Sequence, residues 1–176
     1  MSLLERIQNL ARTAAGYAGR ALLGETVQLP RARATIQHHR KGELLGEETV
    51  HNVITKSGRD FLHLQGYGTT GLGTNGLNYI GLSDDTLTED ADSTTLSNEI
   101  VANGLSRAQG TVSHTASTNT TTIQKVFTCT TSAQAAQKAA LFDAASSGTM
   151  NHALAFTQRS LQVDDTLTIT FTITLG

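Results

Sequence analysis

The chain has 176 residues, of which 38% are hydrophobic and only 16% are charged, and its formal net charge is −2. This length accommodates one domain with or without a tail, and the hydrophobic content is too high for a disordered chain. The single cysteine, Cys129, excludes an intrachain disulfide and a metal site built from cysteines alone.

The composition favours β structure, because Thr, Ser, Gly and Asn take the place of the missing charged residues. Thr suits half-buried strands, and Gly and Asn suit turns. No apolar run reaches the length of a membrane span. Charged residues interrupt the N-terminal stretch, which excludes a signal peptide, although the stretch shares the amphipathic, acid-poor character of a transit peptide. We expect synthesis in the cytoplasm without export.

Charge is divided unevenly along the chain. Residues 1–41 contain seven basic and two acidic side chains, whereas residues 42–176 contain six basic and thirteen acidic ones. Such asymmetry is typical of an arm that binds a negative surface, on a neighbouring copy, a partner protein or nucleic acid, although a solvated helix face would show the same charges.

The first predicted element is an amphipathic helix over residues 2–23, because apolar residues recur there at steps of three and four. Two interior glycines weaken this helix, so we expect it to become ordered only against a partner. We predict that residues 1–30 form a basic, helical, partner-binding arm. Its predicted contacts are the apolar anchors Leu3, Ile7, Leu10 and Leu22 and the charged residues Arg12, Arg20, Arg31 and Arg33.

Alternating apolar residues after Pro30 predict a strand over 31–38, near a sheet edge, and a short strand between Gly42 and Gly46. The spacing of the apolar residues then changes. Apolar residues from Val50 to Leu62 recur at helical spacing and predict a helix over about 51–65.

Most of the remaining elements are predicted strands, at residues 78–83, 107–115, 122–130, 150–156 and 166–175. The last is the clearest, because five apolar residues alternate with five threonines, which is typical of a strand with one face in a core. The alanine-rich segment 133–142 favours a short helix. The predicted fold is mainly β, an antiparallel sandwich of jelly-roll or immunoglobulin-like type with short helices, over residues 31–176.

No motif indicates catalysis. Two G-x-G-x-x-G matches within residues 66–76 lie after a predicted helix and before a strand, the reverse of the order in a dinucleotide site. The histidines lack the spacing of metal ligands, and His152 falls on the apolar face of its strand, as a hydrogen-bonded core histidine would. The acidic loop 84–92 lacks calcium-loop spacing, which favours a solvated loop or a docking site for arginines. We expect no enzyme activity, no cofactor and no specific nucleic-acid binding.

Several segments, in this order, resemble a group of tailed-phage virion proteins described as minor head, decoration or tail-associated proteins. They are Asn52–Leu62, Asn78–Ser83, Gly104–Ala108, Ala140–Asp143, Gly148–Met150 and Asp164–Phe171. The resemblance covers roughly residues 50–174 and rests on structural motifs. It implies a virion location and a β-sandwich, and leaves head or tail open.

These observations together favour a capsid decoration or cement protein. The expected partners are the major capsid protein and neighbouring copies of the chain. We expect a homo-oligomer, and a trimer by analogy with the local threefold axes of capsids. Two alternatives remain open: a tail, head–tail junction, fibre or baseplate component, and a glycan-binding module that uses loops 66–76 and 84–92.

Overall fold

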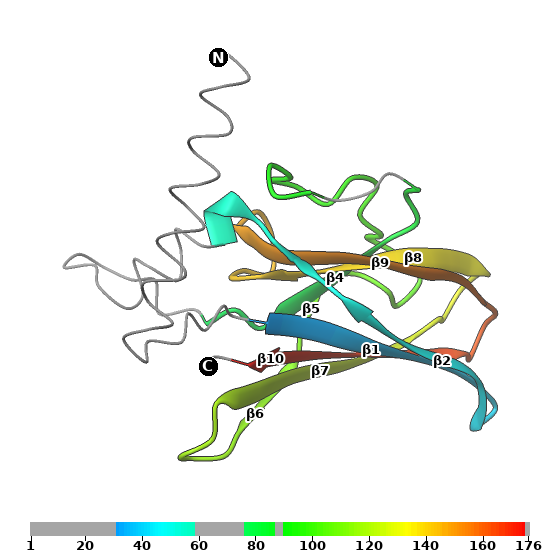
Figure 1. The fold of residues 1–176 in the computed structure, drawn as a ribbon. Coiled ribbons are helices and arrows are strands. Elements are labelled where there is room, and N and C mark those ends of the chain that lie inside the picture. The colour runs from blue at the N-terminus through cyan, green and yellow to red at the C-terminus, as the bar shows by residue number, and fades with distance from the viewer. Residues whose placement is uncertain (1–30, 59–75, 87–89, 175–176) are drawn as a thin grey trace, which may run out of the picture. The chain divides into compact units, whose positions relative to one another are not determined.

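The computed structural model describes residues 31–58, 76–86 and 90–174, without the side chain of Arg31. Residues Arg31–Thr174 form one compact unit of ten strands (Figure 1). The strands are β1 (Arg31–Arg40), β2 (Glu43–His51), β3 (Val53–Ile54), β4 (Tyr79–Ser83), β5 (Ala108–Gln109), β6 (Thr111–His114), β7 (Thr120–Thr128), β8 (Gln134–Phe142), β9 (Met150–Leu161) and β10 (Thr166–Thr174). The predicted arm helix lies outside the described residues.

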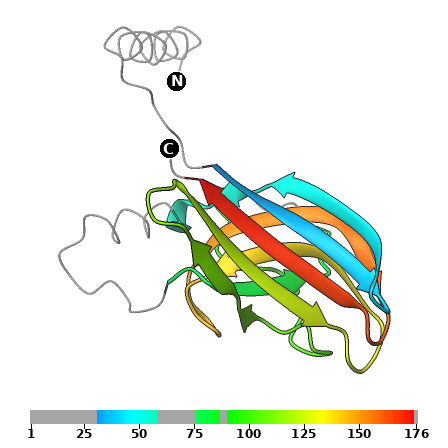
Figure 2. The ribbon, with the colours of Figure 1, turned by 90° about the horizontal axis from the view of Figure 1, so that it is seen from below.

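The strands form two antiparallel sheets that pack face to face, so the predicted β-sandwich is confirmed. Sheet A has the order β2-β1-β10-β7-β6 and sheet B the order β3-β9-β8-β4-β5. Figure 2 shows sheet A from its outer side, with β10 between β1 and β7. At each edge the chain passes directly from one sheet to the other, at Asn52 between β2 and β3 and at Gly110 between β5 and β6.

The core between the sheets is organised around β10. Its alternate residues Leu167, Ile169 and Phe171 are fully buried, and Ile169 lies opposite Ile36 of β1 in the antiparallel register. Each such side chain contributes about 2 kcal/mol of gross hydrophobic stabilisation. The facing side chains of sheet B include Leu82, Leu141 and other members of the same apolar cluster.

Sheet B differs from sheet A in that part of it is buried on both faces. A second apolar cluster lies on its outer face and joins Leu96, from the segment between β4 and β5, to Ala140, Phe142, Met150 and Ala153. The same segment places Asp85 next to the buried Lys138, with Nζ and Oδ2 3.2 Å apart. The described parts of segment 84–107 therefore cover the part of the outer face of sheet B around Ala140, Phe142 and Met150.

The predicted helix over 133–142 is wrong, because these residues form β8. β8 lies inside sheet B, between β9 and β4, and five consecutive residues from Lys138 to Phe142 are buried. Alanine has a high helix propensity, but small side chains also fit a strand that is covered on both faces. Here tertiary packing overrides propensity.

The predicted helix over 51–65 is wrong at its start, where His51 ends β2 and β3 occupies Val53–Ile54. Residues 56–58 do form a helical turn, and residues 59–65 lie outside the described part of the chain. The hydroxyl of Thr55 accepts a hydrogen bond from Gly58 N at 3.0 Å and caps this turn. A Cβ on Gly58 would lie 2.5 Å from Asn151 O, which shows a close approach of the turn to β9.

The strand predicted over 31–38 is confirmed and extends to Arg40, and it lies near the edge of its sheet as predicted, next to the edge strand β2. β2 and β10 flank it on both sides. The short strand predicted between Gly42 and Gly46 is part of β2, which is the edge strand and continues to His51.

Candidate partner-binding face

The outer face of sheet A is lined with threonines. We call it the threonine face and define it by the outward residues of its five strands. They are Glu47, Thr49 and His51 on β2; Arg33, Thr35 and Gln37 on β1; Thr168, Thr170, Thr172 and Thr174 on β10; Thr120, Thr122, Gln124 and Val126 on β7; and Thr111 and Ser113 on β6. Among these residues only Arg33 and Glu47 carry a full charge.

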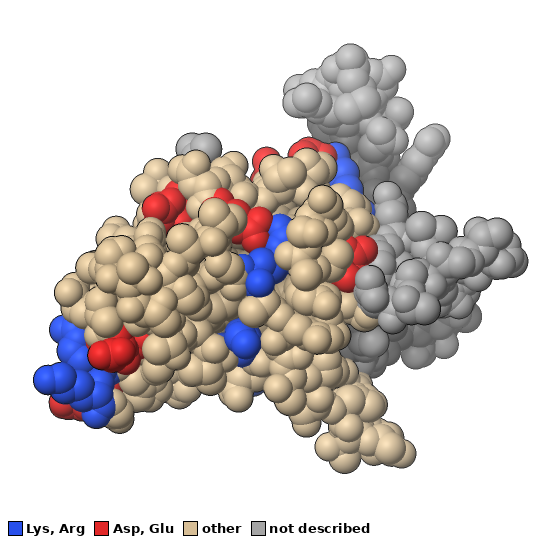
Figure 3. Space-filling view, turned by 180° about the vertical axis from the view of Figure 1, so that it is seen from behind, with Lys and Arg blue, Asp and Glu red and all other residues tan. Residues whose placement is uncertain are grey.

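Hydrogen bonds between neighbouring strands hold several of these side chains in place. Gln124 Nε2 donates to Thr170 Oγ1 at 2.9 Å, and Gln37 Nε2 donates to Glu47 Oε2 at 2.6 Å. The hydroxyls of Thr35 and Thr49 lie 3.1 Å apart. The face therefore presents an ordered set of neutral hydrogen-bonding groups. On the side seen in Figure 3, too, neutral side chains cover most of the described surface.

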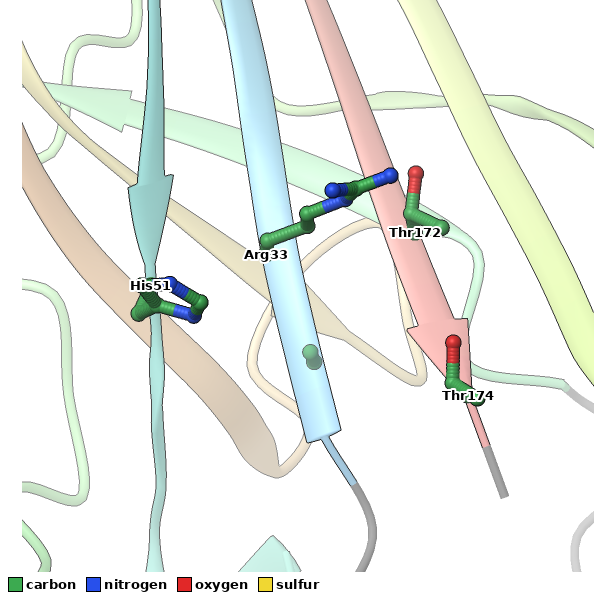
Figure 4. A pocket seen from close by; sticks show the side chains of 5 residues that line it. Arg33, His51, Thr172 and Thr174 are labelled. Carbon is green, nitrogen blue, oxygen red and sulfur yellow. The ribbon is translucent and has the colours of Figure 1, made fainter. Parts of the chain in front are cut away.

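A hollow of about 340 Å³ lies on this face near the start of β1, lined by Ala32, Arg33, His51, Thr172 and Thr174 (Figure 4). Arg33 lies opposite His51 on one side and opposite Thr172 on the other. The Arg33 side chain extends across β1 toward Thr172, and the His51 ring points toward β1. The hollow thus brings together a guanidinium, an imidazole and two hydroxyls from three adjacent strands.

The other end of β1 carries an ion pair that joins two turns. The buried carboxylate of Asp165 accepts hydrogen bonds from Arg40 Nε at 2.9 Å and Nη2 at 2.8 Å, and lies 3.0 Å from His38 Nε2. The hydrogen bond from Arg40, with those from Gln162 N and His38, holds the pKa of Asp165 below its ordinary range. Because Arg40 and Asp165 satisfy each other, this cluster fixes the strand ends and offers no free charge to a ligand.

Two buried titratable groups have pKa values shifted by burial. The pKa of His152 falls from 6.5 to about 4, and neither ring nitrogen has a hydrogen-bond partner among the described residues. His152 is therefore a core histidine as expected, but the expectation that its ring is hydrogen-bonded is wrong. Burial also raises the pKa of the Cys129 thiol, which suits a structural cysteine better than a nucleophile.

Only one predicted partner-binding residue has a described side chain. Arg33 is exposed and lines the hollow. Arg31 belongs to β1, but its side chain lies outside the described part. The same is true of all the arm residues, Leu3, Ile7, Leu10, Leu22, Arg12 and Arg20.

Sequence reasoning missed His51, Thr172 and Thr174 as parts of a site. The alternation in β10 does indicate that its threonines face solvent. Their neighbours cannot be read from that pattern, because β1 and β10 are separated by most of the chain and their register depends on the fold.

The acidic loop 84–92 is not a fully solvated segment. Asp85 is buried against Lys138, and Asp92 pairs with Lys56. In the described ranges no group of three or more His, Cys, Asp or Glu side chains is placed to hold a metal ion. Loop 66–76, the other part of the predicted glycan site, lies outside those ranges.

Among the described residues, no helix has the length and apolar character needed to cross a membrane. No family model, curated protein or solved structure matches the chain.

Proposed function

We propose that this chain is a capsid decoration protein that binds the assembled shell of a tailed phage and stabilises it. The threonine face carries this proposal. It is the outer side of a five-stranded sheet, and all of its threonines but Thr168 are at least partly exposed, whereas the described parts of segment 84–107 cover part of the outer face of sheet B. Neutral hydroxyls and amides lose less hydration free energy on docking than charged groups do, and they form hydrogen bonds with a partner.

The sequence adds a second contact to this face. The basic arm of residues 1–30 precedes β1, and the apolar anchors and arginines of the arm would engage the major capsid protein or a neighbouring copy. Residues 42–176 carry an excess of acidic residues, so a neighbouring copy also offers the arm a negative surface. On a symmetric shell, many weak contacts of this kind add up through avidity. The proposed assembly is a homo-oligomer in the virion, with a trimer expected.

The copy number of the chain in purified virions, measured by quantitative mass spectrometry against the major capsid protein, tests this proposal. A ratio near one to one, or one per capsomer contact, supports a decoration protein. A ratio of a few percent supports the alternative, a tail, head–tail junction, fibre or baseplate component, in which the same face would dock into a ring. Absence from virions contradicts both.

A binding assay with shells that lack this chain tests the face itself. The variant Thr170→Lys adds a charge at the centre of the threonine face, where the side chain is partly exposed. We expect it to fold and to bind shells at least about tenfold more weakly, because the longer, charged side chain would have to lose its hydration at the centre of the contact. The matched control is Gln158→Lys, an exposed position on β9 of sheet B. Equal binding by the two variants would place the contact elsewhere.

A further inference from the structure

We propose that the hollow around Arg33 is a carboxylate-binding site that receives an Asp or Glu side chain of the shell protein. The inference rests on the proposed function for the source of the carboxylate, but not for the site itself.

The first argument is that Arg33 lacks an acidic partner. The structure describes four arginine side chains, and three of them pair with a carboxylate: Arg40 with Asp165 at 2.8 Å, Arg107 with Glu99 at 2.6 Å and Arg159 with Glu48 at 3.5 Å. Arg33 makes no ion pair or hydrogen bond within the described part of the chain. Its guanidinium is exposed in a hollow, and its five N–H donors remain available.

The second argument is the surrounding chemistry. The hydroxyls of Thr172 and Thr174 can donate hydrogen bonds, and so can the imidazole of His51. The other charged residue of the threonine face, Glu47, lies opposite Gln37, four residues along β1 from Arg33 and therefore about 13 Å away. Its carboxylate is already bound by Gln37. The hollow is thus a local positive region on a neutral face.

The third argument is geometric. His51, Arg33 and Thr172 form a row across three strands whose backbones lie about 4.8 Å apart, and Thr174 lies one outward position further along β10. A guanidinium binds the two oxygens of a carboxylate through parallel hydrogen bonds. Thr172 and Thr174 lie on the neighbouring strand, on the side toward which the Arg33 side chain extends (Figure 4). The described residues of the hollow carry one permanent positive charge, which matches one carboxylate better than a dianion and favours Asp or Glu over a phosphate group.

Titration of the full chain with acetate, followed by two-dimensional NMR at constant ionic strength, tests the site without any shell. We expect saturable shifts at the Arg33 Nε–H and at the Thr172 and Thr174 amides. The variant Arg33→Gln should weaken acetate binding at least about tenfold, because it removes the charged donor. Lys41→Gln, in the turn at the other end of β1, removes the same charge away from the hollow and should leave the titration unchanged. Absence of saturable shifts, or tighter binding of inorganic phosphate than of acetate, overturns the inference.

Shell binding by the same variants then tests the source of the carboxylate. Arg33→Gln should lower affinity for shells while Lys41→Gln does not. If both variants weaken shell binding equally, net charge and not the hollow controls docking, and the inference fails. If neither the natural chain nor any variant binds shells while acetate still titrates the hollow, the proposed function fails and the carboxylate site stands.

Discussion

The two sheets of this sandwich are built from similar strands, but their outer faces differ. In sheet A the outer residues of β10 are threonines, all but Thr168 partly exposed, while Leu167, Ile169 and Phe171 face the core. In sheet B the residues of β8 from Lys138 to Phe142 are buried on both faces, because described residues of segment 84–107 pack on the outside. One sheet thus presents an open polar face, whereas the other is partly covered on its outer side.

The difference also explains what the sequence reveals. A strand with one face in water leaves an alternating pattern, as in β10. A strand covered on both faces does not alternate, and when it is rich in alanine it resembles a helix, as in β8. The open sheet is thus easier to recognise from the sequence than the covered sheet.

A charge placed on the outer face of each sheet should reveal the difference between the two faces most strongly, as a difference in stability. Ala140 on the outer face of β8 is fully buried, so Ala140→Glu should lower the free energy of unfolding by about 5 kcal/mol or more, enough to prevent folding. Thr170→Glu on the outer face of β10 should cost no more than about 1 kcal/mol. Urea denaturation measures both. Similar losses would mean that segment 84–107 does not cover sheet B in solution.

The inner faces should behave alike, because the two sheets share one core. Phe171 of sheet A and Phe156 of sheet B both belong to the main apolar cluster. Replacing either residue with alanine should therefore lower the free energy of unfolding by about 3–5 kcal/mol in urea denaturation. A large loss for only one of them would show that the cluster is not shared between the sheets.

The sandwich could be predicted because several strands show clear alternation or turn boundaries, β10 most clearly. The strand predicted over 107–115 illustrates the limit, since the structure divides it at Gly110 into β5 and β6. A Cβ at Gly110 would lie 2.9 Å from Gln124 O, so the glycine permits a close approach where the chain changes sheet. A lone glycine in a strand pattern does not reveal which backbone it approaches.

The candidate site was predictable only in part. Arg33 was identified from the charge of the N-terminal region, but its environment depends on the pairing of β1 with β10 and β2. Pairing between distant strands follows from the packing of the whole core and has no local signal. For the same reason the partners of Arg40 and Arg159 were not predicted, although both arginines are visible in the sequence.

The pH dependence of stability should reflect His152 in the covered sheet. The pKa of His152 is about 4 in the folded chain and 6.5 in the unfolded chain, so the unfolded chain binds a proton first as pH falls. Stability should decrease between pH 6.5 and about 4, by up to about 3 kcal/mol at about 1.4 kcal/mol per pKa unit. Above pH 6.5 the imidazole is neutral in both states and contributes no pH dependence.

The variant His152→Leu should flatten this slope, which urea denaturation at several pH values will measure. The lowered pKa of Asp165 acts in a different window, because its stabilising effect is lost only as pH falls below its ordinary value of 3.8. An unchanged slope in His152→Leu would assign the decrease to other groups.

The smallest effect on stability is expected on the threonine face. Thr170→Ala removes the hydrogen bond that Gln124 donates, and because the pair is exposed we expect a loss of about 0.5–1 kcal/mol. Thr174→Ala is the matched control, since the hydroxyls of Thr174 and Thr120 are already 3.4 Å apart and their separation should cost less. If instead Thr170→Ala destabilises the chain as much as Phe171→Ala does, the threonines act as part of the fold. If stability changes little and shell binding weakens, the row of hydroxyls acts in binding, and the open sheet differs from the covered one in function as well as in packing.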